Sequence, residues 1–182
     1  MRIRKLFTLS VVSIILFGCT FPQKTDSKQL QNIIDFYQLD VNDRREIECL
    51  TDNIHFEAGA ESQQGKIAVA FVTMNRVNHP KYPSSVCDVI KQRDKKTCQF
   101  SWVCQKKTTA KKMLTNGHEE KYNYMRDLAM YVYLNYQKLH DPTKGAIFYH
   151  ANYVNPNWKK VRKTVTIGKH IFYKTKPEVK DI

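Results

Sequence analysis

The chain has 182 residues, of which 42% are hydrophobic, enough for one compact core and too few for two. Its formal net charge of +13 favours an anionic partner such as nucleic acid, a membrane face or an acidic polymer, because a strong positive field attracts polyanions whatever the fold. Charge alone does not choose among these partners, and a basic face that only keeps the protein soluble is equally compatible with it.

The N-terminus has the pattern of an export signal. A basic segment over residues 1–5 precedes an apolar run over residues 6–17, which is shorter than the roughly 20 residues needed to cross a membrane. We therefore expect a signal peptide over residues 1–18. Leu16-Phe17-Gly18-Cys19 resembles a bacterial lipobox, which implies a lipid on Cys19 and attachment to a membrane. Thr20 stands where an Asp would signal retention in the inner membrane, so the outer membrane is weakly favoured. Ordinary cleavage nearby is the alternative.

Export changes what the charge and the cysteines mean. Without residues 1–18, which hold three basic residues and no acid, the net charge is 13 − 3 = +10, and the exported protein meets the anionic cell wall in the envelope or periplasm. Apart from Cys19, four cysteines remain, and an even number of cysteines in an oxidising compartment predicts disulfides. We favour Cys98–Cys104, which encloses a short loop, together with Cys49–Cys87. Zinc is the competing interpretation, but no ligand motif is present, so we expect no metal and no cofactor.

The first half of the chain predicts helices. After a polar tether over residues 19–42, Asp43 and Glu46 have the spacing of a capping box and begin a helix that ends near Gly59. Ser62 can cap a second helix, whose run from Ile67 to Met74 is apolar on every side and is therefore expected at the centre of the core. Further expected segments are a short helix after residue 83, a charged loop over 91–107, a short helix over 108–116, and a longer helix over 122–139 with Leu128, Tyr131, Val132 and Leu139 inward.

The pattern changes after residue 142. Segments 146–150, 163–167 and 170–173 are rich in β-branched and aromatic residues, and Gly168-Lys169 fits a two-residue hairpin turn. Helices followed by a small C-terminal sheet indicate one α+β domain over residues 43–182, mainly helical.

Glu57 is the residue that this arrangement singles out for acid chemistry. On a helical wheel it falls beside the apolar stripe, one turn after Ile54, so its surroundings should be partly apolar. Burial disfavours the ionised form and raises the pKa of a carboxyl group, which suits a Glu that protonates a glycosidic oxygen. A solvated or helix-capping Glu is the simpler interpretation of one such residue considered alone.

Five blocks of sequence, in order, resemble the SleB/CwlJ family of cell wall hydrolases over roughly residues 46–174. The blocks are His55-Phe-Glu-Ala-Gly-Ala-Glu61 with Gly65 to Val77, Tyr82-Pro83, Val86 to Ile90, Cys98-Gln-Phe-Ser-Trp102 with Cys104, and Gly145 to His150 with Val154 to Trp158 and Ile167 to Tyr173.

The resemblance implies a lysozyme-like or lytic-transglycosylase-like fold and cleavage of the β-1,4 bond between N-acetylmuramic acid and N-acetylglucosamine in peptidoglycan. Glu57 takes the position of the family's acid and Glu61 that of the second Glu in the same motif, while Gly59-Ala60 replaces an Arg-Gly pair. Hydrolysis by two carboxylates would need a partner for Glu57, for which Glu61, Asp52 and Asp88 are the candidates. We favour the lytic transglycosylase route, in which one acid suffices.

Aromatic and amide side chains are expected to complete the sugar site. We place Tyr149, His150, Asn155 and Trp158 in the cleft, with Gln99, Phe100 and Trp102 on the opposite wall, whereas Phe148 and Phe172 are expected in the core and Asn75 and Arg76 at the end of the central helix. The expected partner is peptidoglycan, bound by a monomer. A non-catalytic wall-binding lipoprotein is the main rival, and a nucleic-acid-binding role is disfavoured by export and by the lack of a binding motif.

Overall fold

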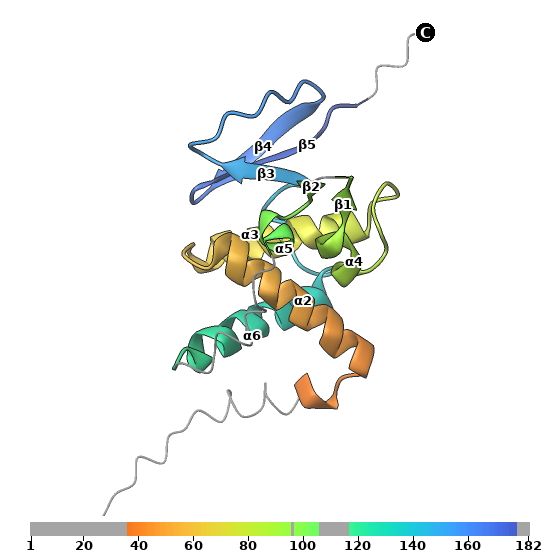
Figure 1. Cartoon of the computed structure of the whole chain (residues 1–182), viewed down its shortest axis with the longest axis vertical. Helices are drawn as coiled ribbons and strands as arrows, with labels where there is room; N and C mark the ends of the chain where they lie inside the picture. Colours follow the sequence, from red (N-terminus) through yellow and green to blue (C-terminus); the bar gives the residue numbers. More distant parts are fainter. Residues whose placement is uncertain (1–35, 96, 106–116, 178–182) are drawn as a thin grey trace, which may run out of the picture.

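The computed structural model describes residues 36–95, 97–105 and 117–177. A three-stranded sheet lies at one end of the molecule with α3 beneath it, α2 runs from beside α3 away from the sheet, and α6 lies farther from the sheet (Figure 1). The elements in chain order are α2 (Val41–Ala58), α3 (Gln63–Val77), α4 (Val86–Lys91), β1 (Arg93–Asp94), β2 (Thr97–Cys98), α5 (Ser101–Cys104), α6 (Glu119–Asn135), β3 (Phe148–Ala151), β4 (Val161–Ile167) and β5 (His170–Thr175).

Helix α2 begins earlier than its sequence pattern predicted. Its N-cap is Asp40, whose side chain accepts a hydrogen bond from the backbone N–H of Asn42 at 2.7 Å. The predicted capping pair instead joins α2 to other helices: Asp43 accepts from the hydroxyl of Tyr133 at 2.9 Å, and Glu46 accepts from the first backbone N–H groups of α4. Glu46 therefore caps the neighbouring helix α4, and Asp43 ties α2 to α6.

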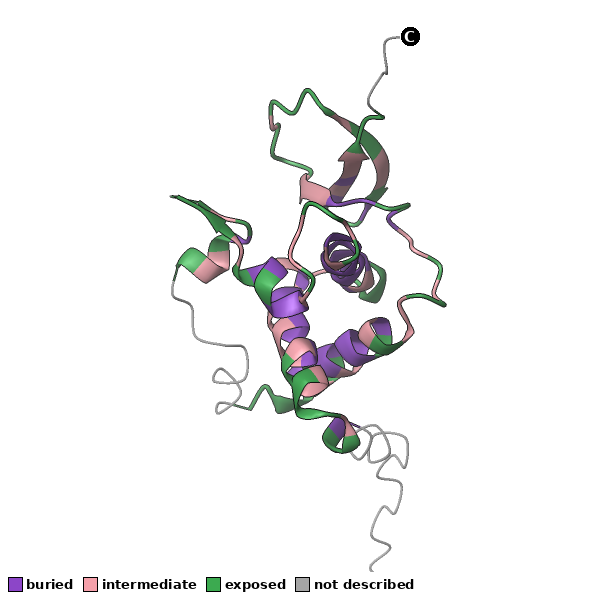
Figure 2. Ribbon diagram, turned by 90° about the vertical axis from the view of Figure 1, so that its right-hand side faces the viewer, coloured by how far each residue is buried: buried purple, intermediate pink, exposed green. Residues whose placement is uncertain are grey.

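Helix α3 is the centre of the fold, as its uninterrupted apolar run predicted. The side chain of Ser62 caps it by accepting from the N–H of Gly65 at 3.3 Å. Figure 2 shows this helix end-on beneath the sheet, almost wholly in the colour of buried residues. One side of α3 packs against α2, α4 and α6, and Ala68 and Val72 on the other side pack against the sheet residues Ile167 and Phe172.

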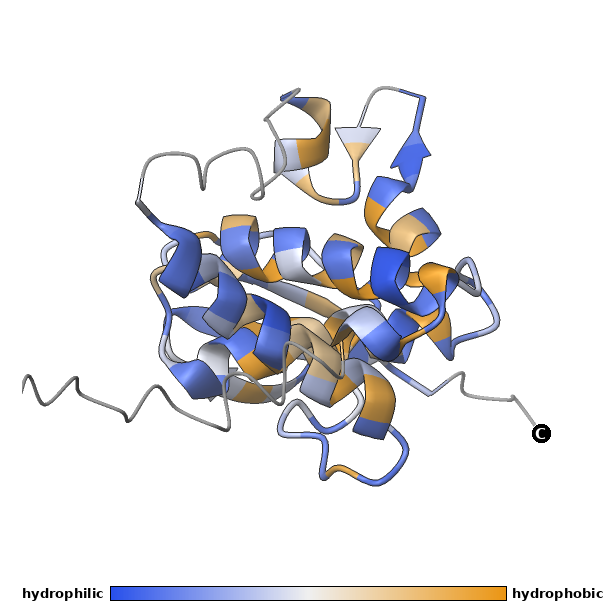
Figure 3. Cartoon of the chain, turned by 90° about the horizontal axis from the view of Figure 1, so that it is seen from below, coloured by the Kyte–Doolittle hydropathy of each residue, from blue (hydrophilic) through white to orange (hydrophobic). Residues whose placement is uncertain are grey.

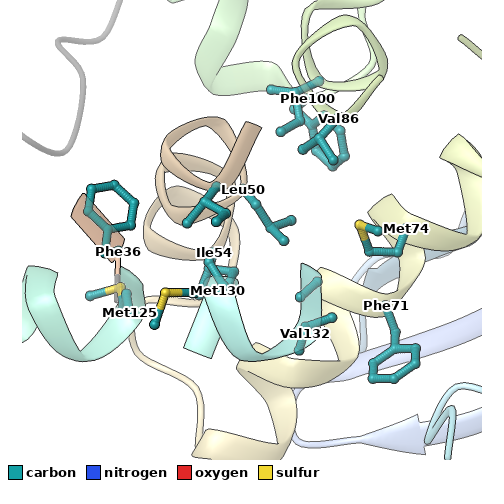
Figure 4. Close-up of a cluster of buried hydrophobic side chains, with 14 residues drawn as sticks. Phe36, Leu50, Ile54, Phe71, Met74, Val86, Phe100, Met125, Met130 and Val132 are labelled. Atoms are coloured by element: carbon teal, nitrogen blue, oxygen red, sulfur yellow. The ribbon is translucent and has the colours of Figure 1, made fainter. Parts of the chain in front are cut away.

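The main core lies between the helices. Hydrophobic and hydrophilic residues alternate around α2 and α6, so each helix turns one apolar side inward (Figure 3). Leu50, Ile54, Phe71, Met74 and Val132 meet in this cluster (Figure 4). Phe36 also packs there and is only 4% exposed, so the packed region begins before the predicted boundary at residue 43.

Helix α6 begins three residues before its predicted start and ends four residues before its predicted end. Leu128 and Val132 are buried as expected, and Leu139, beyond the helix, is half-buried against the core. The expectation for Tyr131 was wrong, because its side chain is 50% exposed. Tyr131 lies about 100° around the helix from Val132, beyond the edge of the stripe that Leu128 and Val132 form.

The segment predicted as a charged loop contains regular structure. Strands β1 and β2, which have two residues each, pair as an antiparallel hairpin, and the one-turn helix α5 follows. Both predicted disulfides are present, Cys49–Cys87 between α2 and α4 and Cys98–Cys104 between β2 and α5. The helix predicted over 108–116 lies outside the described residues, as do the expected signal peptide and lipidated cysteine.

The sheet is antiparallel with strand order β3-β5-β4, and β4 starts two residues before its predicted bounds. Gly168 occupies the predicted hairpin turn at φ +56°, a left-handed conformation that favours glycine. The register pairs Tyr149 with Phe172 and His150 with Ile171. Because successive side chains of a strand point to opposite faces, Tyr149 and Phe172 face α3 and His150 faces away from it.

Candidate active site

Glu57 lies in the last turn of α2, next to the buried Ala58. Its side chain is half-buried and borders a pocket of about 220 Å³. The other residues that line this pocket come from α3, the Cys98–Cys104 loop and β3, namely Arg76, Gln99, Phe100, Ser101 and Tyr149. Glu57 is the only carboxylate among these lining residues.

Tyr149 holds the carboxylate of Glu57. Its hydroxyl donates a hydrogen bond to Oε2 of Glu57 at 3.0 Å. The ring is fixed from behind by Phe172 and His170, with ring centroids 5.7 and 5.1 Å away. Burial first, and the negative charge of Glu57 second, raise the pKa of Tyr149 well above its usual value, so the hydroxyl stays protonated and available to donate at neutral pH.

Arg76 lies on the side of the pocket formed by α3, with only 2% of its surface exposed. Its Nε donates to the backbone oxygen of Ile147 at 2.8 Å, and its guanidinium group lies 5.2 Å from the ring centre of Phe100. With the amide of Gln99 turned to its hydrogen-bonding orientation, the Gln99 oxygen accepts from both terminal nitrogens of Arg76. Burial lowers the pKa of Arg76, while nearby Tyr82, Tyr149 and Glu57 raise it.

The disulfide loop supplies a further wall of the pocket, in contact with Arg76 of α3. Gln99, Phe100 and Ser101 all border the pocket, within the ring closed by the Cys98–Cys104 bond. Gln99 also borders a wider groove of about 610 Å³ along the β1–β2 hairpin, so it joins the pocket to that groove.

Trp102, predicted for the same wall, lies behind it. Its ring stacks on Phe56 at 4.6 Å, and its Nε1 donates to the side-chain oxygen of the buried Asn53 at 3.1 Å. Asn53 in turn donates to Thr73 of α3 at 3.1 Å. Trp102 therefore fastens the disulfide loop to α2 and α3 and is absent from the residues that line the pocket.

The candidates for a second carboxylate are engaged elsewhere. Glu61 accepts from the backbone N–H of Lys169 in the β4–β5 turn at 3.2 Å, and Asp88 accepts from the hydroxyl of Ser85 at 2.8 Å. Asp52 is close enough to Tyr122 of α6 for its charge to help raise the pKa of that phenol, after burial. None of the three borders the pocket of Glu57.

The aromatic residues predicted for the cleft separate into two groups. Tyr149 reaches Glu57, whereas His150 lies on the outer face of the sheet, with its ring stacked on Tyr173 at 5.2 Å. Trp158 lies on the same outer face against His150, and Asn155 is exposed in the β3–β4 connection. Phe172 is fully buried as predicted.

Phe148 is not a core residue. It is half-buried on the outer face, 5.9 Å from Trp158. It differs from Phe172 because its cross-strand partner is Tyr173, which shares that face. Sequence reasoning also missed Arg76 and Ser101 as pocket residues, although an arginine two residues after a fully apolar helical run was a signal that its side chain needs buried partners.

Comparison with known proteins agrees with this architecture. A family model described as Cell Wall Hydrolase matches residues 60–173, which is more than half of the chain. The chain belongs to the cell wall hydrolase family. The match covers most of the pocket residues and begins three residues after Glu57. No curated protein matches the chain.

Two solved structures are similar to this cell wall hydrolase. One is the catalytic domain of the SleB protein from Bacillus cereus, with 24% identity and a TM-score of 0.52 over 72% of this chain and 91% of that one. The other is the catalytic domain of the germination-specific lytic transglycosylase SleB from Bacillus anthracis, with 26% identity and a TM-score of 0.52 over 75% of this chain and 98% of that one. The fold is thus that of a SleB catalytic domain, a lysozyme-like α+β fold.

In the described ranges, no group of three or more His, Cys, Asp or Glu side chains is arranged to hold a metal ion. No helix in the same ranges is long and apolar enough to cross a membrane.

Proposed function

We propose that this cell wall hydrolase cleaves peptidoglycan strands between N-acetylmuramic acid and N-acetylglucosamine as a lytic transglycosylase, with Glu57 as its acid and base. The observation that carries this proposal is the pocket in which Glu57 is the only carboxylate and is held by the hydroxyl of Tyr149. The similar protein from Bacillus anthracis is described as a germination-specific lytic transglycosylase, which supports the same route.

In this mechanism Glu57 protonates the glycosidic oxygen while positive charge develops at C1 of the muramic acid. The leaving sugar departs with that proton. Glu57 then removes the proton from the C6 hydroxyl of the same muramic acid, whose oxygen bonds to C1 and closes a 1,6-anhydro ring. The proton returns to Glu57, so one carboxyl group completes the cycle and no water is consumed.

The remaining pocket residues would bind and orient the sugar. Gln99 and Ser101 offer hydrogen-bonding groups, and Phe100 supports the wall from which they project. Because Gln99 also borders the groove along the β1–β2 hairpin, we assign that groove to the continuing glycan strand. Arg76 places a positive charge beside the ionised Glu57 that remains after proton transfer.

The decisive variant is Glu57→Gln, which keeps the size of the side chain and loses the proton. Release of muropeptides from purified sacculi should fall by at least about 10²–10⁴-fold, while thermal unfolding stays close to wild type. The matched control is Glu61→Gln, which removes a carboxylate that is bonded to the β4–β5 turn and should lower turnover far less. Near-wild-type digestion by Glu57→Gln would refute the assignment of the acid.

Mass spectrometry of the products tests the route. A lytic transglycosylase leaves 1,6-anhydro ends, whereas a two-carboxylate muramidase leaves reducing ends that are heavier by one water. Reducing ends together with an inactive Glu61→Gln variant would establish the muramidase alternative. A wild-type protein that binds sacculi and releases no muropeptides would be the non-catalytic lipoprotein.

We also propose that the protein is exported and held in the cell envelope by lipid on Cys19. The lipobox-like segment supports this, and family membership agrees with an extracytoplasmic place of action. Cys19→Ser should move the protein from the membrane fraction to the soluble fraction. A mature N-terminus elsewhere, without the mass of acyl chains, would contradict the anchor and leave the proposed catalysis untouched.

A further inference from the structure

The outer face of the sheet carries an aromatic cluster that the proposed catalytic pocket does not use. Phe148 and His150 of β3 and Tyr173 of β5 share this face, and Trp158 folds back onto it from the β3–β4 connection. The ring of Trp158 lies 5.4 Å from His150 and 5.6 Å from Tyr173. We call these four residues the outer cluster. Tyr149, which bonds to Glu57, points to the opposite face.

The outer cluster is held by hydrogen bonds and is open to solvent at Trp158. The two ring nitrogens of His150 are bonded to the backbone oxygen of Ala151 and the hydroxyl of Tyr173, each at 2.9 Å. Trp158 nevertheless keeps 41% of its surface exposed, and Tyr153 in the same connection keeps 84%. The described helices lie on the other side of the sheet (Figure 1), so none of them covers this face. A fixed aromatic surface open to solvent loses little conformational freedom when a ligand packs on it.

The same part of the chain is strongly basic. Residues 142–177 contain eight Lys and Arg and no Asp or Glu, which is most of the net positive charge of the protein. Lys163 lies opposite Tyr173 in the strand register and so shares the outer face, and the exposed Lys159 and Lys160 directly follow Trp158. The positive charge therefore adjoins the outer cluster.

The ligand must match apolar rings, amides and positive charge together. Pyranose rings have apolar faces that pack on aromatic side chains, and their hydroxyl and N-acetyl groups can bond to exposed amides such as those of Asn155 and Asn157. Lysines attract the carboxylates of peptide stems. Insertion into a membrane surface buries a continuous apolar face, whereas the exposed Tyr153, Val154 and Trp158 alternate with exposed asparagines at 152, 155 and 157.

We propose that the outer cluster and its lysines form a second peptidoglycan-binding surface, separate from the pocket of Glu57, that holds a glycan strand while the pocket acts on sugars elsewhere in the wall. This proposal rests on the proposed function for the identity of the polymer. It assigns His150, Trp158 and Asn155 to retention of the polymer instead of to the cleft.

The test measures binding without turnover, so that it is independent of the catalytic proposal. In the Glu57→Gln background, co-sedimentation with purified sacculi is measured as a function of salt. Adding Trp158→Ala should weaken binding about tenfold, and Trp158→Phe, which keeps an aromatic ring, should restore much of it. Adding Lys159→Gln and Lys163→Gln should weaken binding and flatten its salt dependence.

The matched control is Lys121→Gln with Lys138→Gln, which removes the same charge from exposed positions on the helical side. This pair should bind nearly as well as the parent. An equal loss of binding in both lysine pairs would show that only the net charge matters and would contradict a role for the lysines of the outer face. Unchanged binding by Trp158→Ala would overturn the proposal. Tighter binding to vesicles of phosphatidylglycerol in phosphatidylcholine than to sacculi, lost in Trp158→Ala, would also overturn it and assign the face to a membrane.

Discussion

Tyr149→Phe deletes the hydroxyl that donates to Glu57 and leaves the ring packed against Phe172 and His170. A hydrogen bond to a charged group contributes about 1.5–3 kcal/mol. If it orients Glu57 for proton transfer, its loss should lower kcat/KM by about 10- to 150-fold. We expect the lower part of this range, because Glu57 is only half-buried and water can replace the hydroxyl.

The pH profile gives the prediction a second readout. A hydrogen bond to the ionised carboxylate favours the ionised form, so removing it should move the alkaline limit of activity to higher pH. The assay is the initial rate of muropeptide release from sacculi between pH 4 and 9. The matched control is Tyr133→Phe, which deletes another hydroxyl bonded to a carboxylate, that of Asp43, away from the pocket. Equal rates for the two variants at every pH would refute the role of Tyr149.

Two further predictions concern stability. Removing Cys49–Cys87, which closes a 38-residue separation, should cost about 4 kcal/mol, and removing Cys98–Cys104, with a separation of 6, about 2–3 kcal/mol. Denaturant titration measures both losses of stability. Where both variants stay folded, removing Cys98–Cys104 should lower activity more than removing Cys49–Cys87, because only Cys98–Cys104 closes the loop that borders the pocket. Burial lowers the pKa of His170, so the folded state binds a proton less readily than the unfolded state, and stability should fall as pH drops below about 6.5. His170→Gln should flatten this dependence in thermal melts, and an unchanged slope would assign it to another group.

The central helix and the hairpin could be predicted because their signals are local. The apolar run of α3 excludes an exposed helix, and Gly168 followed by a β-rich segment fits a tight turn. The hairpin β1–β2 could not be predicted in the same way, because strands of two residues carry no periodicity. The start of α2 was missed because Asp43 and Glu46 have capping-box spacing but serve distant partners.

The candidate site was predicted where the residues match the family blocks. Glu57 and Tyr149 lie together, although 92 residues separate them. Grouping His150 with Tyr149 ignored the two-residue period of a strand, which alone would have placed neighbouring side chains on opposite faces. The buried side chain of Arg76 is held by Gln99, Phe100 and the backbone oxygen of Ile147, 71 residues away. A local sequence pattern cannot reveal partners so far along the chain.

Glu61 and Gly168 imply a constraint on how this sequence can diverge. The Glu61 carboxylate lies over the β4–β5 turn, and a Cβ atom at position 168 would overlap its Oε2. The positive φ at Gly168 independently disfavours a larger residue. Descendants of this protein should therefore tolerate a shorter side chain at position 61 on its own, and a larger residue at position 168 should appear only after that shortening.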